Sequence, residues 1–117
     1  MESIRQKFGN AFVGLREGWK SESSFRFQVV VGLLVIIAGV ILKISRLDWL
    51  FVSLAIGMVL SLEMINTVLE KFLDVVHPEL GDKVRIVKDM AAAVVFIASL
   101  TAAIIGLLVF IPYLRAL

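Results

Sequence analysis

The chain has 117 residues, of which 60% are hydrophobic and 19% charged, with a net charge of +2 and no cysteine. A soluble domain typically has about 45–50% apolar and about 25% charged residues, so this composition excludes a water-soluble globule and indicates one integral membrane domain. The weak and scattered basic charge argues against a nucleic-acid-binding protein, and the lack of cysteine excludes disulfides, thiol redox chemistry and thiolate zinc sites.

The first predicted element, residues 1–24, is an amphipathic helix. Apolar residues at helical spacing form one stripe, and charged residues, most of them basic, lie off it; the stripe consists of Ile4, Phe8, Ala11, Phe12, Leu15 and Trp19. A helix with aromatic residues on its apolar face is typical of segments that lie along a membrane surface. The alternative is a short soluble helix packed on a loop, for which a small membrane protein offers little core.

Three membrane-spanning helices are predicted next, at residues 25–42, 48–70 and 90–114. A spanning helix needs about 20 mainly apolar residues, within a range of roughly 17–25. The third segment carries no charge, whereas the second reaches this length only if Glu63 lies inside it. The second helix is expected to continue to about residue 75, and residues 76–89 to form a loop. The predicted fold class is therefore an all-α integral membrane protein with a surface helix and three spans.

The basic residues also predict an orientation in the membrane. They are frequent before the first span and between the second and third spans, whereas the opposite side has only Lys43, Arg46 and Arg115. Lysine and arginine concentrate in the cytoplasmic segments of membrane proteins. The N-terminus and the loop at residues 76–89 are therefore expected in the cytoplasm.

Polar side chains share one face of the second span near its C-terminal end. At about 100° per residue, Glu63, Glu70 and Asp74 lie within roughly 40° of one another, and Asn66 lies about 60° to one side. A carboxylate at the depth of Glu63 costs about 2.5–3.5 kcal/mol on insertion scales and marks a functional site by default. Hydrogen bonding between helices is the structural alternative, but three carboxylates on one stripe repel one another unless a cation or basic partner lies between them.

Candidate partners for these carboxylates lie on the same side of the membrane. Glu22 precedes the first span, and Lys88 and Asp89 precede the third. Oxygen ligands from Glu22 and Glu70 suit Mg²⁺, which usually takes one or two carboxylates together with waters and substrate phosphates. Lys88 suits a phosphate as a point charge. A base, a metal and a cation around a nucleotide indicate phosphoryl transfer.

The stretch "SLEMINTVLEKFLD", followed by "KDMAAAVV", resembles the small prokaryotic diacylglycerol kinase and undecaprenol kinase family. The segment "VGLREGWKSESSFRFQ" is similar to the region before the family's first span, so the resemblance covers almost the whole chain. It implies an ATP- and Mg²⁺-dependent lipid kinase of the bacterial cytoplasmic membrane. The implied acceptor is the hydroxyl of diacylglycerol or undecaprenol, and the implied assembly is a homotrimer whose site is shared between neighbouring chains.

The resemblance also implies roles for individual residues. Glu63 becomes the general base on the lipid hydroxyl, and Asn66 the neighbour that orients it. The implied ligands of the magnesium ion are Glu22 and Glu70, with Asp74 as a supporting residue. The implied ATP-binding residues are Asn10, Glu22, Glu70, Lys88 and Asp89. The residues implied near the lipid substrate are Trp19, Phe25, Arg26 and Glu63. Asn10 departs from the family pattern, because an aromatic residue occurs there in some members.

Two other functions explain part of the pattern. A small proton-coupled transporter needs the intramembrane Glu63 but leaves the other carboxylates and the Lys-Asp pair without a role. A non-catalytic membrane assembly protein uses the polar stripe only for contacts between helices, and composition alone does not exclude it.

Overall fold

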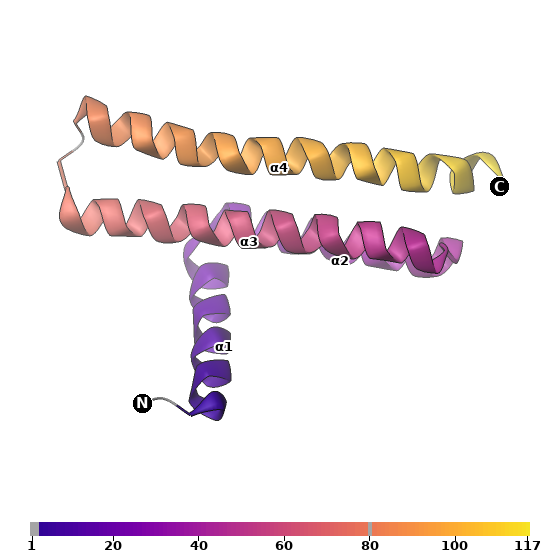
Figure 1. Cartoon of the computed structure of the whole chain (residues 1–117), viewed down its shortest axis with the longest axis horizontal. Helices are drawn as coiled ribbons and strands as arrows, with labels where there is room; N and C mark the ends of the chain where they lie inside the picture. The colour runs from indigo at the N-terminus through magenta and orange to yellow at the C-terminus, as the bar shows by residue number, and fades with distance from the viewer. Residues whose placement is uncertain (1–2, 80) are drawn as a thin grey trace.

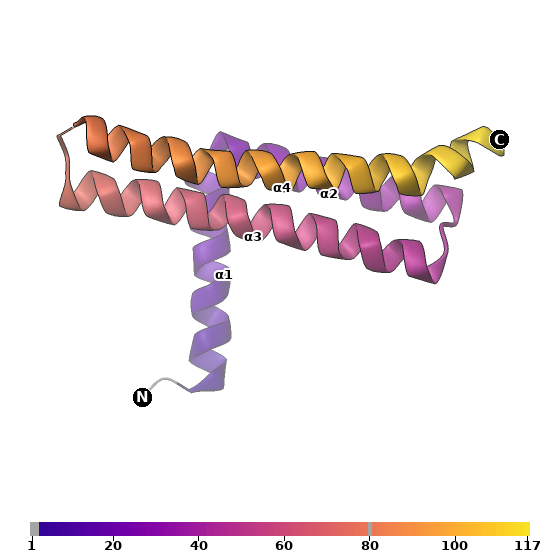
Figure 2. The same cartoon turned by 45° about the horizontal axis from the view of Figure 1, so that its top comes forward.

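The computed structural model describes residues 3–79 and 81–117, which form helices α1 (Ile4–Ser21), α2 (Ser23–Leu42), α3 (Arg46–Val76) and α4 (Asp82–Arg115). Helices α2, α3 and α4 run side by side, and α1 projects crosswise from this bundle (Figure 1). The turned view in Figure 2 shows the same arrangement. Each bundle helix is long and apolar enough to cross a membrane. The all-α fold with three potential spans is therefore confirmed.

Helix α1 begins at a capping box. The Gln6 N–H donates to Ser3 Oγ at 3.2 Å, and the Ser3 N–H donates to Gln6 Oε1 at 2.8 Å. This reciprocal pair satisfies two backbone donors that a helix N-terminus otherwise leaves without a partner. The first two residues of the helix predicted at 1–24 lie outside the described part of the chain.

The corner between α1 and α2 lies at Glu22, whose extended backbone (φ −129°, ψ 117°) ends one helix and begins the next. The helix predicted to residue 24 is therefore shorter at this end. Arg26 Nη1 donates to the carbonyl oxygens of Trp19 at 2.6 Å and Lys20 at 3.2 Å. These bonds satisfy carbonyls at the C-terminus of α1 that have no partner within the helix. Arg26 thus joins the last turn of α1 to α2.

Helix α1 also approaches α3 closely at this corner. Gly18 is buried, and a Cβ atom added there would lie 2.6 Å from Cε of Met64 on α3. The absence of a side chain at Gly18 leaves this space to the end of the Met64 side chain. The base of α1 is therefore fixed to the bundle, although most of α1 extends away from it (Figure 1).

The bundle is joined differently at its two ends. At one end, Lys43 in the left-handed region (φ 55°) ends α2, and α3 starts after Ser45. The Tyr113 hydroxyl accepts from the Ser45 N–H at 2.8 Å and donates to Asp48 Oδ2 at 2.6 Å, which ties the end of α4 to the start of α3. A small apolar core containing Val52 and Val109 packs beside this junction.

At the other end, α4 begins at Asp82, so the loop predicted at residues 76–89 is confined to residues 77–81. Asp82 lies in the first turn, where a carboxylate interacts favourably with the helix dipole. Its Oδ1 is 3.2 Å from Nη2 of Arg85, one turn later, and such pairs support a helix. Because α4 starts at Asp82, Lys88 lies on a regular helix that packs against α3. Its place on this helix fixes the direction of its side chain.

Candidate functional site

Glu63 lies inside the bundle, with only 3% of its surface exposed. Its Oε1 accepts a hydrogen bond of 2.6 Å from Oγ of Ser24, on the first turn of α2. Below it, the Thr67 hydroxyl donates to the Glu63 main-chain carbonyl at 3.1 Å and leaves the carboxylate untouched. The carboxylate thus has a buried position and, in the described part of the chain, a single hydrogen-bond donor, which comes from a neighbouring helix.

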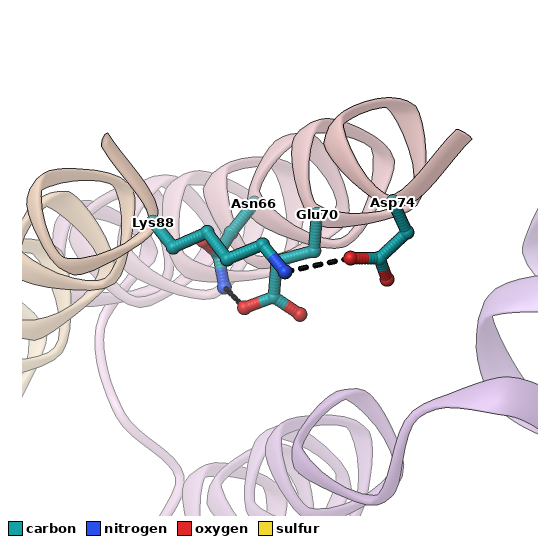
Figure 3. Close-up of polar contacts among 4 residues, drawn as sticks. All are labelled: Asn66, Glu70, Asp74 and Lys88. Carbon is teal, nitrogen blue, oxygen red and sulfur yellow. Dashed lines mark hydrogen bonds and ion pairs between the residues drawn. The ribbon is translucent and has the colours of Figure 1, made fainter. Parts of the chain in front are cut away.

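A second polar group lies farther along α3 and includes one residue of α4. Lys88 Nζ is 2.6 Å from Asp74 Oδ1, and Asn66 Nδ2 donates to Glu70 Oε1 at 3.4 Å. The four side chains point to the same side of α3 (Figure 3). Lys88 is the basic partner that the predicted stripe of carboxylates requires. The structure therefore brings together Asn66, Glu70, Asp74 and Lys88, all of which the sequence had singled out.

The Asn66 side chain bonds to Glu70, and its role in orienting Glu63 stays a prediction. Its amide group donates to Glu70, and no hydrogen bond joins it to Glu63 within residues 3–79 and 81–117. The spacing of four residues, which places two side chains on the same helix face, already signalled this contact. Asn66 Oδ1 is buried and has no hydrogen-bond partner among the described residues. An unsatisfied buried acceptor costs about 1–3 kcal/mol. A hydrogen-bond donor or a cation at this oxygen would remove that cost.

Other predicted residues lie apart from this group. Glu22 is at the corner between α1 and α2 and makes no side-chain capping bond. Asp89 follows Lys88 on α4 and is exposed. Asn10 lies on α1, twelve residues before Glu22, which is about 18 Å at 1.5 Å per residue. In the described part of a single chain, no hydrogen bond or ion pair joins Glu22 to Glu70.

Besides Glu63, the other three residues predicted near the lipid lie at the same corner but differ in environment. Trp19 is exposed on α1, and Arg26 binds main-chain oxygens of α1. Phe25 is buried, with 4% of its surface exposed, and contacts the position of Gly18. Phe25 therefore packs the corner in this chain, and only Trp19 presents its ring to the surroundings.

The described side chains can supply only part of the ligand shell of a magnesium ion. Among the described residues, no three carboxylate, histidine or cysteine side chains gather closely enough to form a metal cage. Mg²⁺ is usually held by one or two carboxylates, with waters and substrate phosphates completing its shell. Glu70 suits that partial shell, and the Asn66 amide N–H donates to one of its oxygens.

Sequence reasoning missed Ser24. A serine near the start of a predicted helix is common, and its contact with Glu63 joins residues 39 positions apart. The available signal was its place two residues after Glu22 at the expected membrane boundary.

An apolar cavity of about 230 Å³ lies between α2, α3 and α4. Val59 and Leu60 line it, one turn before Glu63 on α3, and Gln28 lines it, one turn after Ser24 on α2. Gln28 Nε2 donates to Ser99 Oγ at 3.5 Å across the bundle. This apolar space therefore ends about one helical turn from Glu63.

Comparison with known proteins identifies relatives of the whole chain. The family model of prokaryotic diacylglycerol kinase matches residues 9–110. The chain is 32% identical over 109 residues to undecaprenol kinase of Bacillus subtilis, which covers 93% of this chain and 89% of that protein. It is 30% identical over 111 residues to diacylglycerol kinase of Synechocystis, covering 94% of this chain and 63% of the relative. A diacylglycerol kinase of Escherichia coli is 28% identical over 96 residues, with 82% and 79% covered.

Proposed function

The chain belongs to the prokaryotic diacylglycerol kinase family and is a lipid kinase, and we propose that it transfers the γ-phosphate of magnesium-bound ATP to a membrane lipid alcohol. The observation that carries this proposal is the separation of two polar groups on one helix. Buried Glu63 lies about one helical turn from an apolar cavity, and Glu70 with Lys88 lies nearer the exposed end of α3. An acceptor from the membrane and a nucleotide from water can each reach one group. The family assignment does not favour the transporter or the assembly protein.

At the membrane end, Glu63 acts as the general base. The lipid hydroxyl oxygen attacks the γ-phosphorus, the bond from that phosphorus to the bridging oxygen breaks, and ADP leaves. The proton of the hydroxyl passes to the Glu63 carboxylate. A general base must lie within hydrogen-bond reach of the proton that it removes. Its burial at 3% exposure supports this role, because water competes little for the carboxylate.

At the nucleotide end, Lys88 binds a phosphate and Glu70 serves as a ligand of the magnesium ion. Lys88 Nζ pairs with Asp74 in the free chain, and Asp74 holds it in an extended position that a phosphate oxygen can reach. Glu70, together with Glu22, would hold the magnesium ion, and Asp89 belongs to the same nucleotide-binding set. When bound, magnesium neutralises negative charge on the phosphates during transfer.

We also propose that the working enzyme is a homotrimer in the bacterial cytoplasmic membrane, with its N-terminus in the cytoplasm. The apolar residues Phe8 and Phe12 of α1 are exposed, which suits a helix lying in the membrane interface. Asn10 is about 18 Å from Glu22 along α1, so one chain does not bring it to the nucleotide end. The α1 helix of a neighbouring chain can supply that residue.

The acceptor is tested with the two lipids named for the relatives. Purified protein in detergent with added lipid receives labelled ATP and Mg²⁺, together with either diacylglycerol or undecaprenol. We expect label in one of these lipids, and a loss of at least a hundredfold in kcat for Glu63→Gln, because general-base catalysis contributes about 10²–10⁴-fold. Glu79→Gln, at an exposed loop position, is the matched control and should retain activity. An absence of label in both lipids, under conditions in which a known lipid kinase is active, would overturn the proposal.

A further inference from the structure

The two oxygens of the Glu63 carboxylate have different surroundings. Oε1 accepts the 2.6 Å hydrogen bond from Ser24, a length typical of a strong bond from a hydroxyl to a carboxylate. Within residues 3–79 and 81–117, Oε2 has no hydrogen-bond partner. The bundle therefore holds one oxygen and leaves the other able to accept a proton from a substrate.

The Ser24 hydroxyl that holds this oxygen comes from α2, whereas Glu63 itself is on α3. It lies on the first turn of α2, directly after the corner at Glu22 that Arg26 ties to α1. The nearby Thr67 hydroxyl bonds the helix backbone, so α3 supplies no side-chain donor of its own to the carboxylate. The terminal torsion of a glutamate is broad and roughly two-fold. A single donor from a neighbouring helix is thus what distinguishes Oε1 from Oε2.

We infer that Ser24 is a positioning residue for Glu63: its hydroxyl holds Oε1 so that Oε2 faces the hydroxyl of the acceptor lipid. The inference rests on the proposed lipid kinase function. It assigns Ser24 no covalent step, because the proton of the acceptor passes to Oε2 while the Ser24 hydroxyl keeps its own. Catalysis depends on such orientation because a misplacement of about 1 Å in a reacting group can lower the rate about a hundredfold.

Variants at position 24 test this role through kcat and KM. We expect Ser24→Ala to lower kcat about 10- to 150-fold, since hydrogen bonds to charged groups contribute about 1.5–3 kcal/mol, at 1.36 kcal/mol per tenfold. KM for ATP and for the lipid should change by less than about twofold, because nothing that binds the ground state is removed. Ser24→Thr keeps the hydroxyl at an exposed position and should restore most of kcat. Ser23→Ala, the matched control one residue earlier, should retain full activity.

A double variant and mass spectrometry separate this role from others. In the Glu63→Gln background, Ser24→Ala should cause little further loss, because the two residues act as one unit. An equal further loss there, unchanged kcat in Ser24→Ala, or failure of threonine to restore kcat in a folded protein would overturn the inference. Phosphate found on Ser24 after incubation with ATP would also overturn it, by making this hydroxyl an acceptor. If the unmodified protein transfers label to neither lipid, the proposed function is refuted, and this result is distinct from a failure of the role of Ser24.

Discussion

Lys88 allows the proposed nucleotide end to be tested with a single substitution, Lys88→Met. In the free chain its Nζ is 2.6 Å from Asp74 Oδ1, with 26% of the lysine and 64% of the aspartate side chain exposed. An ion pair this accessible to solvent contributes about 0.2–1 kcal/mol at most, so little stability should be lost. A hydrogen bond from the ammonium to a phosphate contributes about 1.5–3 kcal/mol. At 1.36 kcal/mol per tenfold, the expected loss in kcat/KM for ATP is about 10- to 150-fold.

The assay measures phosphorylation of the lipid while ATP and lipid are varied separately. Asp74→Asn keeps Lys88 but removes its anchor, so kcat/KM for ATP should fall no more than about fivefold, the equivalent of 1 kcal/mol. Lys83→Met makes the same charge change at an exposed site on α4 and should have little effect. The reasoning is refuted if Asp74→Asn is as damaging as Lys88→Met. That result would make Lys88 a structural partner of Asp74 instead of a ligand for phosphate.

Two further substitutions probe the metal and the packing of the bundle. Glu70→Gln should raise the Mg²⁺ concentration needed for half-maximal activity at least tenfold, measured by titration at fixed ATP; an unchanged requirement would remove Glu70 from the metal site. Gly39→Ala should lower the unfolding temperature in detergent, because the new Cβ would lie 2.7 Å from Cη2 of Trp49. Such overpacking costs about 1–3 kcal/mol, more than the gain of about 1 kcal/mol in helix propensity. Gly57→Ala, with no atom within 4 Å of the new Cβ, should raise the unfolding temperature; equal shifts for both variants would contradict this account.

The three spans and the polar face of α3 were predictable because each follows from local spacing. A run of apolar residues long enough to cross a bilayer specifies a helix without knowledge of its neighbours. The same periodicity placed Glu70 and Asp74 on one face, and their mutual repulsion called for a cation, which the structure supplies as Lys88. The start of α4 was not predictable in this way. Residues 82–89 are largely polar, so hydropathy does not distinguish a loop from the exposed first turns of a helix.

Contacts between helices were beyond local reasoning. The bond from Ser24 to Glu63 depends on how α2 and α3 are rotated about their axes, and that rotation depends on packing along the whole bundle. The corner at Glu22 could not be predicted either, because the apolar residues of the first segment keep their helical spacing up to the end of the stripe. The roles of Glu22 and Asn10 at the nucleotide end stay predictions, since no hydrogen bond or ion pair among the described residues joins Glu22 to Glu70, and Asn10 lies about 18 Å from Glu22 along α1.

Helix α3 runs unbroken from Glu63 to Asp74, and at 1.5 Å per residue this stretch measures about 16 Å. Its backbone hydrogen bonds fix the distance between the proposed base and the proposed nucleotide end. On the proposed function, an acceptor is selected by the depth at which its hydroxyl sits in the bilayer, more than by the shape of its head. An alcohol without a hydrocarbon anchor has nothing to hold it at that depth. Insertion of one residue between Glu63 and Glu70 would turn the two ends by about 100° relative to each other and leave both groups intact but facing different ways.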